Sequence, residues 1–355
     1  MDFEFEIIDD ENVKITHYTG IAESVTIPDV IQGLPVTSIR MAAFENCESI
    51  INIEIPASVA NLGKYVFKGC SRLSYIIIPA SIMNIMSEYI RDYAEFARNF
   101  LSNQKDIQAD TFINDVSIIY YDIIDGQNVE IINYIGKIEA VVIPKEIQGL
   151  PVTSIGFCSF SRCRNLTSIT IPDSVTDIGK FAFRECYKLE HIIIPNSVTS
   201  IGEGTFSGCV SLTHISIPDS VTKIRNAVFK GCTNLTHVIL PNSITSIGKG
   251  AFRNCENLTN ITLPNSIITI DDRAFMNCIS LTNITIPDSV KSIGDYTFFA
   301  CKNLVNVTIS NTTLIIGRFS FIGYDFKTVN GKKIGIKRNI KNHIDGDFNI
   351  DEIFP

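Results

Sequence analysis

Three histidines at a constant spacing are the residues of this sequence best suited to chemistry. His191, His214 and His237 are 23 residues apart, and the chain contains five histidines in all. Imidazole binds transition metals and titrates near neutral pH, so such a row could form a metal site or a pH-responsive surface. The row contains no carboxylate of its own, and rings at strand spacing form a poor tetrahedral cage. A metal or pH-responsive surface is therefore the weaker alternative to a contact surface, and a duplicated residue without a role is a third reading.

The cysteines follow the same period and indicate structure rather than chemistry. They form no CxxC pair and no zinc-finger spacing, and most of them follow a phenylalanine by three residues. This pattern predicts small buried hydrophobic residues with free thiols. Outside the main module, Cys47 and Cys70 repeat the spacing. The main series is Cys163, Cys186, Cys209, Cys232, Cys255, Cys278 and Cys301.

Signatures of enzymes are missing from the sequence. It contains no phosphate-binding GxxxxGK[ST], no GxSxG, no HExxH and no EF-hand loop. Cys158 lies outside the cysteine series, but the sequence nominates no base for it. We therefore predict no catalytic residue, no bound metal and no cofactor. A hydrolase carried on the cap regions, with Cys158 or an acidic residue in a pocket, is the enzymatic alternative.

An internal repeat of 23 residues must position these side chains. Each turn reads Pro-x-Ser-Val-x-x-Ile-Gly-x-x-Ala/Thr-Phe-x-x-Cys-x-x-Leu-x-x-Ile-x-Ile. The last six positions predict a strand, because residues two apart point to the same face, and the next proline ends it. A period of 23 is too short for a helical pair and lies in the range of leucine-rich repeats. The prolines that mark the turns are Pro172, Pro195, Pro218, Pro241, Pro264 and Pro287.

The repeat resembles the BspA-like branch of the leucine-rich repeats over residues 23–86 and 139–321. The residues that carry the resemblance are those of "IPDSVTSIGxxAFxxCxxLTxI". The predicted fold is a curved leucine-rich repeat solenoid with one short parallel strand per coil, mainly β with short helical turns. The resemblance implies binding of proteins or other macromolecules without catalysis, as in adhesion or host interaction.

A longer duplication divides the chain into two modules. Residues 5–39 align with residues 121–155 at an offset of 116, and both copies carry "IQGLP" in a first turn of 28 residues. The alternating residues before each copy predict a β-hairpin that caps the stack. The segment 87–104 has helical spacing and predicts one inserted α-helix. The expected regions are 1–86 (hairpin cap and first repeats), 87–117 (helix and linker), 118–321 (second cap and main array) and 322–355 (C-terminal cap, with a hairpin around "VNGKK").

The exposed positions of the predicted strands form the candidate binding face. These positions align between neighbouring coils about 4.8 Å apart, so we expect one continuous strand face. Isoleucine and histidine exposed together are typical of a contact patch. A macromolecular ligand is the expected partner, and an array that self-associates is the alternative. The predicted face comprises His191, Ile193, His214, Ser216, His237, Ile239, Asn260, Thr262, Asn283 and Thr285.

Net charge and hydropathy limit the classes of partner and the cellular locations that the sequence predicts. The net charge is −8 and the only basic cluster is short, which argues against nucleic acid. No apolar window is long enough for membrane insertion, and no signal peptide is visible at the N-terminus. Free cysteines then favour the cytoplasm, whereas the family resemblance implies the cell surface, and both locations stay open. The oligomeric state is not predicted.

Overall fold

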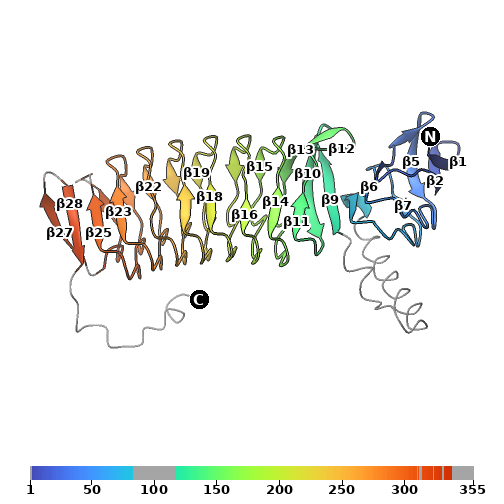
Figure 1. Cartoon of the computed structure of the whole chain (residues 1–355). Helices are drawn as coiled ribbons and strands as arrows, with labels where there is room; N and C mark the ends of the chain where they lie inside the picture. Colours follow the sequence, from blue (N-terminus) through green and yellow to red (C-terminus); the bar gives the residue numbers. More distant parts are fainter. Residues whose placement is uncertain are drawn as a thin grey trace, which may run out of the picture.

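The chain forms an elongated stack of coils with a hairpin at each end (Figure 1). The computed structural model describes residues 2–82, 117–309, 311, 314–322, 324–329 and 332–337. The predicted helix at 87–104 lies outside the described residues, as does the linker up to residue 116. Within the described ranges the only helix is the 3-10 turn η1 (Ala80–Ile82). The Phe-x-x-Cys segments, for which the sequence predicts short helical turns, are tight turns, as in the bond from Cys186 N–H to the Phe183 carbonyl.

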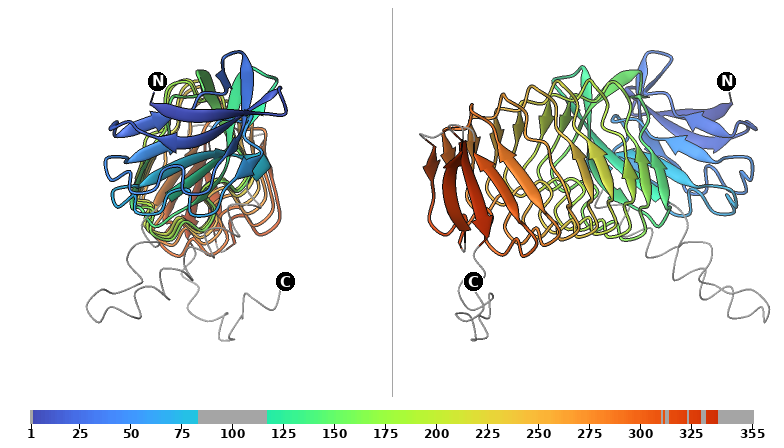
Figure 2. Two further views of the ribbon diagram at one scale, coloured as in Figure 1. Left: turned by 90° about the vertical axis from the view of Figure 1, so that its right-hand side faces the viewer. Right: turned by 60° about the vertical axis from the view of Figure 1, so that its left-hand side comes forward.

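Short parallel strands run in two rows along the stack, and most coils contribute one strand to each row (Figure 2). The pairing offset is 23 residues, as between Ser168 and His191, which confirms the predicted register. The first row follows Leu-x-x and contains β3 (Ser24–Thr26), β6 (Asn52–Glu54), β8 (Tyr75–Pro79), β11 (Ala140–Val142), β14 (Ser168–Thr170), β16 (His191–Ile192), β18 (His214–Ser216), β20 (His237–Ile239), β23 (Asn283–Ile286) and β25 (Asn306–Ile309). The second row contains β5 (Leu34–Ile39), β7 (Asn61–Leu62), β13 (Leu150–Ile155), β15 (Asp177–Ile178), β17 (Ser200–Ile201), β19 (Lys223–Ile224), β21 (Ser246–Ile247), β22 (Thr269–Ile270), β24 (Ser292–Ile293) and β26 (Ile315–Ile316).

Hairpins occur where the sequence predicts them. β1 (Phe3–Ile8) and β2 (Asn12–Tyr18) pair antiparallel, as do β9 (Ser117–Ile124) and β10 (Asn128–Ile135), and β27 (Tyr324–Val329) and β28 (Lys332–Lys337). The "IQGLP" segments form two further hairpins, β4 (Val30–Ile31) with β5 and β12 (Glu146–Ile147) with β13. In the second of these, Gln148 and Gly149 have φ of 53° and 72°. Two successive left-handed residues are what a two-residue hairpin loop requires.

Ladders of identical side chains fill the core between the rows. Neighbouring phenylalanine rings from Phe160 to Phe321 have centroids 4.8 to 5.6 Å apart. Behind them the cysteines from Cys186 to Cys301 are buried, as predicted, whereas Cys47, Cys70 and Cys163 are partly exposed. None of the ten cysteines forms a disulfide. Since each coil buries the same residues against its neighbours, stacking alone completes the core.

Strand β9 joins the two modules into one stack. It pairs with β10 on one edge and, in parallel, with β8 of the first module on the other. Its side chains alternate between the two cores: Ile118 and Tyr120 pack in the first, and Ile119 and Tyr121 in the second. The hairpin that the sequence predicts as a cap of the second module is therefore also the joint with the first.

The first row is interrupted, so the expectation of one continuous strand face is wrong. Its sheet in the first module continues through β9 and β10 into the second row of the second module. In the second module the row divides into β11–β14–β16, β18–β20 and β23–β25, and no strand forms at 260–263. The second row is also broken, between β17 and β19. Both rows thus part at one coil boundary, which we call the seam.

Candidate functional site

The predicted face exists as a surface. All ten predicted residues are exposed, and the residues that alternate with them, such as Ile215 and Ile284, are buried. This follows from the period of two in a strand that covers a core on one side. The ten residues come from the first row of the second module and from the 260–263 segment that continues it.

The three histidines form a stacked pair and one separate residue. The rings of His214 and His237 have centroids 4.9 Å apart and planes 5° from parallel. His191 lies across the seam, where its Nε2 is 4.0 Å from Oε2 of Glu190. Strand pairing sets the stack, because His214 lies opposite His237 in the β18–β20 register.

Threonine hydroxyls orient the paired rings. Nδ1 of His214 lies 3.0 Å from Oγ1 of Thr213, and Nδ1 of His237 lies 2.9 Å from Oγ1 of Thr236. The Thr236 hydroxyl already donates its hydrogen to the Thr213 carbonyl, at 3.0 Å. His237 Nδ1–H is therefore the donor to Thr236, which leaves the Nε2 lone pair of the neutral ring available at the surface.

Exposed aliphatic side chains form a second column beside the imidazoles. Ile193 is 83% exposed and Ile239 is 65% exposed. Val142, which the sequence reasoning missed, is 63% exposed and pairs with Thr170 in the same column. The longer first turn places Val142 28 residues before Thr170 rather than 23, so the simple period overlooks it. We call Ile193, His214, His237 and Ile239, with His191 at its edge, the contact patch.

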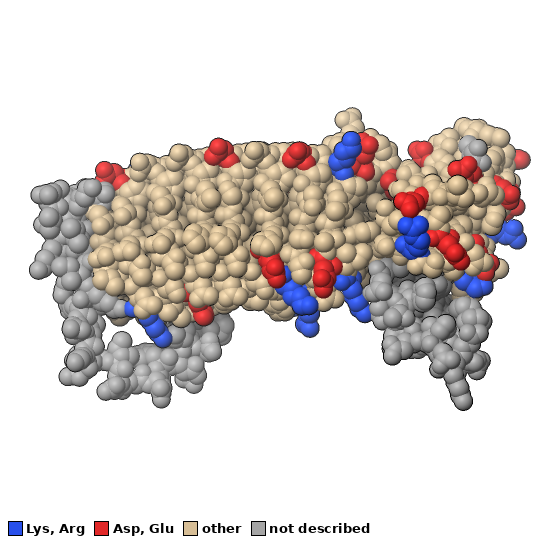
Figure 3. Space-filling model, in the orientation of Figure 1, with Lys and Arg blue, Asp and Glu red and all other residues tan. Residues whose placement is uncertain are grey.

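No fixed charge lies along these two columns in the second module. Figure 3 shows Lys, Arg, Asp and Glu gathered at the rims of the stack, with an uncharged band between them. The outward residues of the row are His, Ile and Ser toward its middle and Asn and Thr toward its C-terminal end. A surface with few charges loses little solvation when it is covered by a partner.

The described residues offer little for metal or acyl-transfer chemistry. No group of three or more His, Cys, Asp or Glu side chains among them is placed to hold a metal ion. Cys158 is partly exposed in a turn, at φ 55°. Burial raises the pKa of the Cys232 thiol to about 12 and keeps it protonated.

Comparison of the sequence with known families decides where the chain belongs. The profile described as "BspA type Leucine rich repeat region" matches residues 17–135, 132–239 and 222–343. The chain belongs to the BspA-type leucine-rich repeat family. Members of this family are built from repeats, which agrees with the coils described above. No curated protein matches the sequence.

Several solved leucine-rich repeat structures are similar to the chain. A leucine-rich repeat protein from Eubacterium ventriosum is 21% identical, with a TM-score of 0.47, over 84% of this chain and 92% of that one. A leucine-rich repeat protein from Bacteroides ovatus is 22% identical, with a TM-score of 0.34, over 86% and 93%. The pneumococcal vaccine antigen PcpA is 16% identical, with a TM-score of 0.34, over 89% and 83%.

The described part of the chain also contains no helix with the length and apolar character needed to cross a bilayer.

Proposed function

We propose that this repeat protein is a non-catalytic scaffold that binds a protein or another macromolecule through the first row of its second module. The observation that carries the proposal is the contact patch: two strongly exposed isoleucines beside two stacked imidazoles, on a band without fixed charges. Exposed apolar surface flanked by polar groups is typical of protein interfaces. Strand pairing between β18 and β20 holds His214, His237 and Ile239, so this part of the patch is preorganised for binding.

The test is capture of partners by the purified chain from an extract of its own cells and from the fluids they meet. The patch variant carries His191→Ser, Ile193→Thr, His214→Ser, His237→Ser and Ile239→Thr, all at exposed positions. Partners retained by the wild type should be at least about tenfold depleted with this variant, because hot-spot residues dominate interface affinity.

The matched control carries Ile268→Thr and Ile315→Thr. Ile268 is 42% exposed and Ile315 71%, and both lie in the return part of the coils rather than the first row. This control should retain the partners. Equal recovery of every partner by wild type, patch variant and control would remove the proposal, as would equal loss in both variants.

A further inference from the structure

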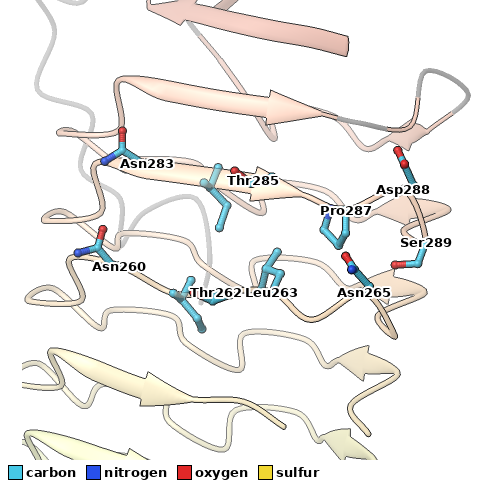
Figure 4. Close-up of a pocket in the computed structure, with 11 residues that line it drawn as sticks. Asn260, Thr262, Leu263, Asn265, Asn283, Thr285, Pro287, Asp288 and Ser289 are labelled. Atoms are coloured by element: carbon cyan, nitrogen blue, oxygen red, sulfur yellow. The ribbon is translucent and has the colours of Figure 1, made fainter. Parts of the chain in front are cut away.

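We propose that a groove toward the C-terminal end of the first row is a binding site for a neutral carbohydrate. The groove has a volume of about 610 Å³ and lies where the 260–263 segment meets β23 and the turn that follows it (Figure 4). Pockets of this size accommodate small organic ligands. This inference concerns other residues than the contact patch and does not depend on the proposed protein-binding function.

Backbone pairing fails along one wall of the groove. Residues 260–263 form no strand, and the amides of Asn260, Ile261, Thr262 and Leu263 donate no backbone hydrogen bond to another described residue. In β23, by contrast, every residue pairs with β25. Unpaired amides at a surface are ready donors for a ligand.

A serine ladder fails at the same place. Ser197, Ser220, Ser243 and Ser266 each donate to a carbonyl of the preceding coil, at 2.5 to 2.7 Å. The equivalent Ser289 lines the groove, and its buried Oγ has no partner. A buried hydroxyl without a partner is costly, so Ser289 and the unpaired amides beside it are polar groups that a ligand in the groove could satisfy.

The chemistry of the lining selects the ligand class. Thr262, Asn265 and Thr285 are exposed and have no side-chain hydrogen bond to another described residue, so amide and hydroxyl groups that both donate and accept are free. Asn283 is already engaged, because it donates to Thr282 and accepts from Asn306. Sugar hydroxyls likewise both donate and accept, so the free groups match them.

The charge and the small apolar area of the groove lining argue against other classes of ligand. The lining contains no Lys or Arg, which disfavours phosphates and other anions, and its single carboxylate, Asp288, is too little for a metal ion. Leu263 and Pro287 are buried at the floor, so only a small apolar area is offered, enough for the C–H face of a sugar ring but not for an apolar ligand. The observations therefore favour a neutral ligand rich in hydroxyls.

The experiment uses the full chain and a panel of neutral saccharides. Glucose, galactose, mannose, xylose and N-acetylglucosamine, each as monomer and short oligomer, are screened by saturation-transfer NMR, and those that bind are titrated by calorimetry. Sialic acid and spermidine serve as anionic and cationic comparison probes. We expect at least one neutral saccharide to bind and neither charged probe to do so.

The variant Thr262→Val/Thr285→Val removes two free hydroxyls with little change of shape. It should weaken saccharide binding about tenfold, since two hydrogen bonds are lost. The control Thr170→Val alters the same column in β14, far from the groove, and should leave binding unchanged. Asn265→Ala serves as a second groove variant if the double variant is unstable. The five-residue patch variant should keep saccharide binding, which separates this inference from the proposed function.

Several outcomes would contradict the proposal of a saccharide site. These are the failure of every neutral saccharide to bind, equal weakening in the Thr170→Val control, and unchanged binding in both groove variants. Binding of spermidine that is lost in Asp288→Asn would show a cation site instead.

Discussion

At the scale of the residue, the buried cysteines behave as hydrogen-bonded hydrophobic groups. The Sγ atoms of Cys209, Cys232 and Cys255 each donate to a phenylalanine carbonyl 26 residues earlier, all at 3.1 Å. Burial raises the pKa of all three thiols above the ordinary value of 9.0. Each of these carbonyls already accepts the amide of the cysteine three residues after the phenylalanine, at 3.1 to 3.2 Å. The thiol is a second donor to the same carbonyl, which an aliphatic residue of the same size could not supply.

These thiols make stability depend on alkaline pH. In the unfolded chain they ionise near 9.0, whereas in the folded chain they stay protonated, so their contribution is complete below pH 9 and is lost as pH rises toward the folded-state pKa. We expect the free energy of unfolding to fall between pH 8.5 and 10.5, by up to about 1.4 kcal/mol per pH unit for each thiol. Urea unfolding followed by circular dichroism measures it.

A single substitution tests whether the buried thiols cause this pH dependence of stability. Cys232→Ala should reduce the slope of stability against pH by about one proton while also lowering stability at pH 7. Phe229→Leu, in the same coil, removes core volume but no titrating group, so it should lower stability without changing the slope. The same slope in wild type and Cys232→Ala would contradict this explanation.

At the scale of the element, β1 and β9 show how one sequence serves as a cap and its duplicate as a joint. At the offset of 116, Asp2 and Glu4 correspond to Ile118 and Tyr120. Both acidic residues are exposed, whereas Ile118 and Tyr120 are buried in the core of the first module. Charged residues on the open face of β1 oppose the stacking of another module, as charges on edge strands commonly do. This works against self-association through the N-terminal edge.

Because β9 contributes side chains to both cores, we expect Tyr120→Glu to uncouple the unfolding of the two modules. A carboxylate would be placed in the first core, and we expect that core to lose about 3 kcal/mol or more. Urea unfolding should then show two transitions, with the second module retained in the later one. Glu4→Tyr changes the equivalent position of β1 at the surface and should leave the number of transitions unchanged. One transition at the wild-type midpoint for Tyr120→Glu would show that β9 does not couple the cores.

The elements divide into those that the sequence predicts and those that it does not. The register of the rows, the phenylalanine and cysteine ladders and the exposure of His214 and Ile239 follow from a period of 23, because identical coils stack in only one way. The hairpins follow instead from the alternating residues that precede each copy of the longer duplication. The pairing of β8 with β9 lies outside this period, since it joins a repeat strand to a hairpin strand. The repeat consensus does not predict the groove either, because the coil that contains Leu263 keeps the consensus although its backbone pairing is lost.

At the scale of the whole molecule, the seam divides the second module into two stacks. Across it, the coils are still held by bonds in the phenylalanine turns, such as Phe206 N–H to the Val228 carbonyl at 2.9 Å. Arg225 stands at the seam where most coils have glycine, and at Gly202 a Cβ would collide with the backbone of Lys180 in the preceding coil. Asp271 fills the same position and keeps its amide bond to Ile247, so a side chain alone does not open the ladder.

Hydrogen exchange should reveal the seam. The amides of Thr245, Gly248 and Asp271 donate to the preceding coil at 2.7 to 2.9 Å, whereas those of the equivalent Thr222 and Arg225 donate no backbone bond to a described residue. We therefore expect the amides of Thr222 and Arg225 to exchange at least about tenfold faster, because unbonded amides need no opening of structure. NMR of the labelled chain measures each site. Equal protection at all five sites would mean that the second row is closed in solution.

The seam is the one coil boundary in the described second module where both rows are interrupted, so we expect the stack to bend there more easily than within the coils on either side. The contact patch straddles it, with Ile193 on one side and Ile239 on the other. A partner that covers both isoleucines must fix the angle between the segments and so loses some affinity to the ordering of the stack. A partner that touches only β18 and β20 carries no such cost, so under the proposed function we expect partners confined to one side of the seam to bind more tightly than partners that span it.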